Sequence, residues 1–275
     1  FASLTPDGKI LDKASTPTPK TLEDLLAWLD QRLSEQDYSG IAMSVPGAVH
    51  QETGVIEGIS AIPYIHGFSW YEALSHHKLP VHLENDANCV GLSELLAHPE
   101  IENAACVVIG TGIGGAMIIN GKLHRGRHGL GGEFGYMTTI EPAEKLNNWS
   151  QLASTGNMVR YVIEKSGQTD WDGRKVYQEA AAGNALCQEA IERMNRNLAQ
   201  GLLNIQYLID PDVISLGGSI SQNPDFIKGV QKAVGAFVDR YEEYTIAPVI
   251  QACTYQADAN LYGALVNWLQ EENQW

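Results

Sequence analysis

The chain has 275 residues, of which 44% are hydrophobic and 19% charged, and its formal net charge is −15. This composition is typical of a soluble globular protein, and the length suits two domains that share a cleft. So large a negative charge excludes a nucleic-acid-binding surface, and no apolar run reaches the roughly 18 residues of a membrane span. No signal peptide is visible, so we expect a cytoplasmic protein. Its four isolated cysteines then predict buried thiols in a reducing compartment. They are Cys89, Cys106, Cys187 and Cys253.

The first part of the chain alternates short apolar strands with helices. We expect, in order, a β-hairpin at 2–4 and 9–11, a helix at 20–33, strands at 40–45 and 55–59, a short helix at 70–75, a strand at 80–83 and a helix at 87–97. Thr21 is a candidate cap for the first of these helices.

A second series of the same plan begins at residue 104. Its expected elements are strands at 104–109, 115–119 and 122–123, helices at 152–165, 174–182 and 185–209, strands at 213–216 and 249–252, and a last helix at 259–269. Two α/β units of similar plan predict an α/β fold with a hinge near residue 104 and a ligand-binding cleft between the units.

Residues 84–88 (Glu-Asn-Asp-Ala-Asn) lie where a predicted buried strand meets a helix. Open α/β sheets bind ligands at the carboxyl ends of their strands. Asp86 could accept a proton from a substrate hydroxyl there, and Asn85 could orient a sugar. Asp and Asn are also the usual helix N-caps, but capping needs one such residue and this segment holds four polar ones. The segment therefore favours a functional site.

Four glycines fall within residues 110–115 (Gly-Thr-Gly-Ile-Gly-Gly), between two predicted strands. Glycine lets the backbone turn sharply and bring N–H groups close to an anion, and Thr111 adds a hydroxyl donor. The segment is neither a P-loop nor a dinucleotide-binding fingerprint. By itself it fits a phosphate-binding loop and a plain glycine-rich hairpin equally well.

Two further segments are rich in glycine. Residues 126–137 present one acid, Glu133, whose carboxylate can accept hydrogen bonds from two sugar hydroxyls; the alternative is a mobile surface loop. The predicted strand at 213–216 opens onto Gly217, Gly218 and Ser219. That turn could pack against a nucleotide, or it could be a simple strand-to-helix turn.

These four segments, in this order and together with Pro46-Gly47, resemble the ROK family of sugar kinases and sugar-responsive repressors over essentially the whole chain. The resemblance implies the two-domain actin/hexokinase-like (ribonuclease H-like) fold with an interdomain cleft. The small α/β domain would comprise residues 1–104 and 259–275, with the last helix crossing back to it, and the large α/β domain residues 105–258.

The resemblance also implies site residues and cofactors. Asp86 would be the catalytic base, and ATP with Mg²⁺ would supply the phosphoryl group. The implied sugar ligands are Pro46, Gly47, Asn85, Asp86, Glu133 and Gln151. The implied ATP ligands are Gly110, Thr111, Gly112, Gly114, Gly115, Gly217, Gly218 and Ser219.

The chain departs from the family pattern in several places. Tyr136 replaces a usual histidine, Gln151 aligns with a second sugar-binding glutamate, and residues 144–156 hold no cysteine, so we expect no structural zinc. Zinc-free members include β-glucoside kinases, which makes a disaccharide or glycoside substrate plausible. The family's first phosphate loop, Asp-x-Gly-Gly-Thr, is missing. Residues 1–8 resemble the second strand of its hairpin, so we expect the first strand and loop upstream of Phe1.

The resulting expectation is an ATP-dependent, glucokinase-like sugar kinase that phosphorylates a hexose or hexoside at the 6-hydroxyl, and that forms a homodimer. A β-glucoside or N-acetylmannosamine kinase is one alternative. A non-catalytic sugar-binding regulator is the other, although the chain leaves no room for the DNA-binding helix-turn-helix of family repressors. Asp86 further favours the enzyme.

Overall fold

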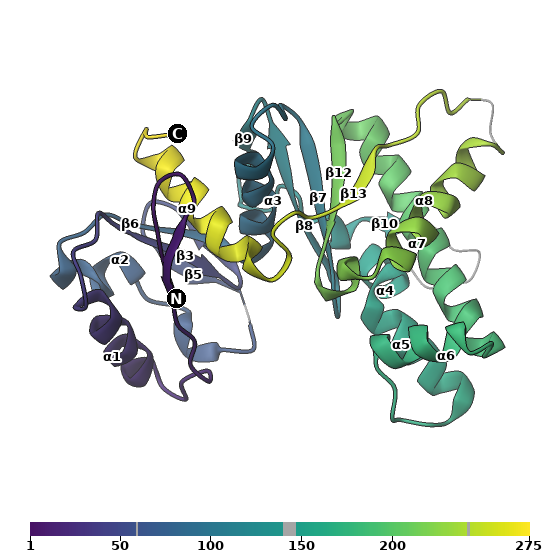
Figure 1. The fold of residues 1–275 in the computed structure, drawn as a ribbon, viewed down its shortest axis with the longest axis horizontal. Coiled ribbons are helices and arrows are strands. Elements are labelled where there is room, and N and C mark those ends of the chain that lie inside the picture. Colours follow the sequence, from purple (N-terminus) through teal and green to yellow (C-terminus); the bar gives the residue numbers. More distant parts are fainter. Residues whose placement is uncertain (59, 140–146, 241–242) are drawn as a thin grey trace.

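The computed structural model describes residues 1–58, 60–139, 147–240 and 243–275. It consists of two α/β parts that lie side by side, with the last helix, α9 (Ala259–Glu271), between them (Figure 1). The expected α/β class is confirmed. Within the described residues, no helix combines the length and the apolar composition needed to cross a membrane.

The second part is built on a five-stranded mixed sheet in the order β13-β12-β7-β8-β9. Strand β12 runs parallel to both β13 and β7, and β8 is antiparallel to β7 and β9. The strands are β7 (Ala104–Ile109), β8 (Ile113–Ile119), β9 (Lys122–Leu123), β12 (Val213–Gly217) and β13 (Ile250–Ala252). Strands β7 and β12 are almost wholly buried, because helices cover both faces of the sheet.

Helices on one face of this sheet enclose the largest hydrophobic core, in which Trp149, Leu198 and Phe226 are fully buried. They are α4 (Trp149–Ala153), α5 (Thr155–Ser166), α6 (Gly173–Ala181), α7 (Ala185–Ile209) and α8 (Pro224–Val238). The opposite face is covered by α3 (Asp86–Ala97), on which α9 packs in turn, and the buried side chains Leu92 of α3 and Val266 of α9 share a second core with Cys106 of the sheet.

The first part contains three two-stranded sheets. They pair β1 (Ala2–Leu4) with β2 (Ile10–Lys13), β3 (Ile41–Val45) with β6 (Val81–Asn85), and β4 (Ala48–His50) with β5 (Val55–Glu57). Helix α1 (Leu22–Leu33) and the short α2 (Trp70–Ala73) complete its core, where Trp70 and Leu83 are fully buried. Thr21 caps α1 as expected, accepting a hydrogen bond from the backbone N–H of Asp24 at 3.1 Å.

An apolar groove of about 650 Å³ lies beside β1 and β3. Phe1, Trp28, Ile41 and Leu265 are among its lining residues. The strand and phosphate loop expected upstream of Phe1 stay a prediction.

Most predicted elements are confirmed, with three informative differences. The helix expected at 152–165 is broken at Ser154, whose buried hydroxyl accepts from the N–H of Asn157 and so begins a new helix. Strand β8 begins two residues earlier than expected, because the glycine turn before it is shorter. Helix α8 and strand β4 were not expected at all. The four cysteines are buried and free, as the sequence predicted.

The division into residues 1–104 with 259–275 and residues 105–258 stays a prediction. Helix α9 packs against α3 and against β3 and β6 of the first part, while α3 also packs on β7 and β8. Helices α3 and α9 therefore form the layer through which the two parts meet.

Candidate active site

The junction between β6 and α3 presents the acidic residue of the site. Asn85 is the N-cap: its Oδ1 accepts from the N–H groups of Ala87 (2.9 Å) and Asn88 (3.1 Å), and its Nδ2 donates to the carbonyl of Gly47 (3.1 Å). Since Asn85 caps the helix, Asp86 is left at the first helical position with its side chain lining a cavity.

This cavity, the central pocket, has a volume of about 530 Å³ and is bounded by α3, the β7–β8 turn, the segment after β9 and the start of α9. Its polar lining consists of Asp86, Glu133, Tyr136, Asn148, Ser150 and Asn260. Gly110, Gly112, Gly114 and Gly135 contribute backbone. The pocket thus brings together members of three of the four sequence motifs.

The two carboxylates of the central pocket hold their protons more tightly than exposed ones would. Burial raises the pKa of Asp86, against the lowering effect of hydrogen bonds from Ala87 N–H and Asn85. Burial also raises the pKa of Glu133, and the charge of Asp86 raises it further. A carboxylate with a raised pKa is a stronger base, and perturbed carboxyls in a cavity are typical of functional sites.

Hydrogen bonds within the turn and to neighbouring helices fix the position of the glycine turn between β7 and β8. Gly110 N–H donates to Gly112 O at 2.9 Å, and Gly156 N–H donates to Gly110 O at 3.1 Å. Ser150 Oγ accepts from the N–H of Ile113 at 2.9 Å. The segment is therefore a tight glycine-rich hairpin whose position is fixed by α4 and α5, and its role toward phosphate stays a prediction.

An ion-pair network supports the residues before Asp86. Glu84, 2% exposed, accepts at Oε1 from the N–H of Asn85 (2.7 Å) and from Asn88 Nδ2 (2.8 Å). Its Oε2 accepts from Arg125 Nε at 2.6 Å. Arg125 Nη2 also donates to Asn267 (2.7 Å) and Glu271 (3.0 Å) of α9. The network ties together β6, the segment after β9 and α9.

Several predicted site residues lie beside the central pocket and do not line it. Gly115 packs against Phe134, Pro46 lines the apolar groove, and Gly47 receives the hydrogen bond of Asn85. Gly218 lies against the end of β7, since a Cβ added to it would meet Ile109 O at 2.1 Å. This contact brings the turn of Gly217, Gly218 and Ser219 next to the glycine hairpin. Thr111 is exposed at the tip of that hairpin.

Gln151 has a structural task in α4. Its Oε1 accepts from the N–H of Asn148 at 3.0 Å while Asn148 Oδ1 accepts from the N–H of Gln151 at 2.9 Å, which forms a capping box. Its predicted sugar contact stays a prediction. The segment expected to lack zinc, 144–156, lies partly outside the described residues, which omit 140–146.

Sequence reasoning did not single out Arg125, Ser150, Asn148 or Asn260. Asn148 and Asn260 carried a local signal, since each is an Asn beside the start of a helix. Arg125 and Ser150 carried none, because their partners are 41 and 37 residues away along the chain.

Comparisons with known proteins agree on one family. The family model described as "ROK family" matches residues 1–271. A beta-glucoside kinase of Listeria monocytogenes is 34% identical over 283 residues, covering 98% of this chain and 94% of that protein. A crystal structure described as a ROK family protein from Streptococcus pneumoniae TIGR4 in complex with sucrose is 90% identical. It covers 100% of this chain and 95% of that one, with a TM-score of 0.98.

The crystal structure of a ROK hexokinase from Thermus thermophilus is also similar, with a TM-score of 0.84 and 27% identity over 97% of this chain and 93% of that one. These likenesses confirm the fold class expected from the sequence.

Proposed function

The chain belongs to the ROK family, and from that premise we propose that it is a sugar kinase that transfers a phosphoryl group from ATP to a hydroxyl of a hexose or hexoside. The observation that carries the proposal is the place of Asp86 at the start of α3. Its carboxylate lines the central pocket together with Glu133 and faces the same cavity as the glycine hairpin.

Asp86 is the catalytic base in this proposal. In phosphoryl transfer the protein mainly positions the reactants and stabilises the charge on the transferring phosphoryl group. The attacking hydroxyl must also lose its proton. The Asp86 carboxylate takes that proton. Partial desolvation at the pocket wall raises its pKa, which brings its basicity closer to the working pH and makes it a better acceptor than a fully solvated aspartate.

Glu133 and Asn85 orient the sugar. Glu133 lines the central pocket and offers two carboxylate oxygens to a pair of hydroxyls. Asn85 has its Oδ1 occupied by two backbone N–H groups and one Nδ2 hydrogen donated to Gly47. Its remaining N–H hydrogen-bonds Asp86, so Asn85 orients the sugar by holding the Asp86 carboxylate in place. The Glu84–Arg125 pair acts through Asn85 and is a positioning element.

The glycine hairpin is placed to receive the phosphates of ATP. Its Gly110, Gly112 and Gly114 line the central pocket with backbone, and a Cβ on Gly110 would meet no atom within 4 Å, so a ligand can approach closely. Backbone N–H groups in such a turn attract anions. The turn at Gly217 and Gly218 lies against the base of the hairpin and would contact the nucleoside part of ATP.

Mg²⁺ enters with ATP and offsets phosphate charge when bound. The carboxylates among the described lining residues of the central pocket belong to Asp86 and Glu133; either could give Mg²⁺ an oxygen that its base or sugar-binding role leaves unused. Within the described residues, the glycine hairpin contributes no side-chain carboxylate to this pocket.

The acceptor class follows from the relatives and the pocket. A relative named beta-glucoside kinase and a very similar protein crystallised with sucrose both point to an acceptor that carries a second ring. Tyr136, 72% exposed, stands at the pocket where the family usually has a histidine, and its ring offers a surface on which a sugar ring can pack. The 6-hydroxyl is the proposed site of transfer, and a homodimer in the cytoplasm is the proposed state.

The test is a coupled ADP-release assay on the full-length protein with a panel of acceptors: glucose, N-acetylmannosamine, cellobiose and sucrose. We expect ADP release that depends on Mg²⁺ and on one class of acceptor, with the phosphate found at the 6-position by NMR. Saturable binding of these sugars without acceptor-dependent ADP release would favour the non-catalytic regulator.

A further inference from the structure

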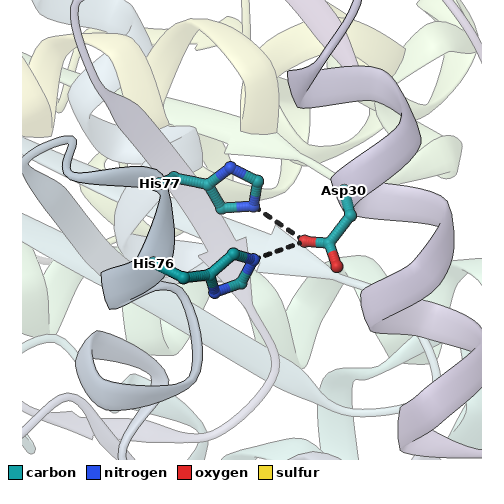
Figure 2. A group of neighbouring side chains, drawn as sticks. All are labelled: Asp30, His76 and His77. Carbon is teal, nitrogen blue, oxygen red and sulfur yellow. Dashed lines mark hydrogen bonds and ion pairs between the residues drawn. The ribbon is translucent and has the colours of Figure 1, made fainter.

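A cluster of potential metal ligands lies on the surface of the first part of the molecule. Figure 2 shows Asp30, on α1, facing His76 and His77, which belong to the 3-10 turn Ser75–His77. His77 Nε2 lies 2.7 Å and His76 Nε2 3.0 Å from the same carboxylate oxygen, Asp30 Oδ1. The three ligand atoms all lie within 4.8 Å of one another.

The backbone holds these side chains together from distant points of the chain. Asp30 lies beside Leu29, which packs on the core of the first part and so fixes this turn of α1. The 3-10 turn ends at Lys78, which adopts the left-handed conformation with φ = 56° and reverses the chain directly after the histidines. The convergence is therefore a property of the fold.

The two imidazoles differ in exposure but act as a pair. The side chain of His77 is 15% exposed and that of His76 is 55% exposed, and their ring centroids lie 4.1 Å apart. His77 is thus an anchored ligand at the inner edge of the cluster. Asp30 and His76 lie at the outer edge, where water can complete a coordination sphere.

The chemistry of the three groups is that of a borderline transition-metal site. Zn²⁺ binds imidazole nitrogen and carboxylate oxygen at 2.0–2.2 Å, so tetrahedral ligand atoms are roughly 3.4 Å apart. The observed 2.7 and 3.0 Å separations require only a small outward movement of Asp30 and His76, whose side chains are 44% and 55% exposed.

We propose that Asp30, His76 and His77 form a binding site for one Zn²⁺ or a chemically similar ion such as Cu²⁺ or Ni²⁺. The ion replaces the two N–H···O hydrogen bonds: each Nε2 proton is released to water or moves to Nδ1 as the ring changes tautomer, and the freed Nε2 lone pair binds the metal. Mg²⁺, which prefers oxygen ligands, does not compete.

The proposed ion joins α1 to the turn after α2 and so braces the first part of the molecule. None of its three ligands lies among the described lining residues of the central pocket. Its role is stabilisation of the fold, and it is independent of the proposed phosphoryl transfer.

The test is calorimetric titration of ZnCl₂ into untagged, chelator-treated full-length protein in excess Mg²⁺, with thermal unfolding in parallel. We expect saturable binding of one ion and a Tm that rises by roughly 5 °C at a hundredfold excess over Kd. Asp30→Asn and His76→Gln keep the side-chain shape and should weaken binding at least tenfold. The control His98→Gln, at a partly exposed histidine beside Glu100, should bind like the unaltered protein.

A second measurement needs no variant. Electron paramagnetic resonance of the Cu²⁺ complex of the unaltered protein should show coupling to two imidazole nitrogens. Coupling to fewer nitrogens, no saturable Zn²⁺ binding below about 1 mM, or unaltered binding in Asp30→Asn would each overturn the proposal.

Discussion

Replacing Arg125 by Gln should destabilise the protein strongly, because it leaves the carboxylate of Glu84 buried without its charged partner. Glu84 is 2% exposed and Arg125 28% exposed, so the pair is screened by little water. Removing one partner of a buried ion pair costs about 3–5 kcal/mol. Because Oε1 of Glu84 keeps its two hydrogen bonds from Asn85 and Asn88, we expect the free energy of unfolding to fall by the lower value in this range, about 3 kcal/mol.

The assay is urea and thermal unfolding of Arg125→Gln with kcat measured in parallel. A loss of about 3 kcal/mol corresponds to a fall in Tm of roughly 6–10 °C for a chain of this size. The kcat should also fall, because Glu84 holds the backbone N–H of Asn85 directly before Asp86, the proposed base. In the double variant Glu84→Gln/Arg125→Gln no charge is buried unpaired, so its loss should be smaller than the sum of the single losses.

The matched control is Arg32→Gln, since Arg32 also pairs with a glutamate, Glu35, at 2.9 Å, but this partner is 40% exposed. An exposed pair contributes below about 1 kcal/mol. If Arg125→Gln loses no more stability than Arg32→Gln, the reasoning from burial is wrong.

Three further predictions concern the central pocket and its surroundings. Burial raises the pKa of Asp86 above its ordinary 3.8, and the protonated acid cannot accept a proton. The kcat/KM should therefore fall, as the pH is lowered, at a higher pH than a fully solvated aspartate would give; an acid limb at or below pH 3.8 would contradict this. A raised folded-state pKa also means that the stability contributed by Asp86 is present below its unfolded pKa and lost as the pH rises through the folded pKa. Asp86→Asn should therefore raise the Tm at pH 7, and a fall would refute the sign. Gly218→Ala should cost more than about 1 kcal/mol in urea unfolding, because φ is +88° and the new Cβ would lie 2.1 Å from Ile109 O. Gly235→Ala, inside α8 with no atom within 4 Å of the added Cβ, should be neutral or stabilising by about 0.5–1 kcal/mol. If the two variants lost the same stability, the contact between the new Cβ at position 218 and Ile109 O would not be the cause.

The features that could be predicted from the sequence are those set by neighbours in the chain. Asn85 and Asp86 lie where a short strand ends and a helix begins, and the strand end, the helix cap and the candidate base are all set by adjacent residues. The glycine turn was visible for the same reason. Helix α8 also had a local signal that the sequence interpretation overlooked: Asn223 caps it and Pro224 occupies its first position.

The features that could not be predicted depend on contacts between distant segments. Arg125 meets Asn267 across 142 residues, and nothing near either residue indicates the pair. Asp30 and His77 meet across 47 residues. The break at Ser154 lies between these cases, since its serine signals a cap but the surrounding apolar spacing continues the helical pattern.

The measurement that tests the account most directly compares the turnover and the sugar affinity of Asp86→Asn. Asn keeps the shape of the side chain and removes the base, so kcat should fall by about 10²–10⁴-fold while the sugar Kd, measured by calorimetry, stays within about threefold. Asp172→Asn, at the exposed N-cap of α6, is the control and should keep the unaltered kcat. An Asp86→Asn protein that phosphorylates its sugar at the unaltered rate would contradict the assignment of this carboxylate as the base.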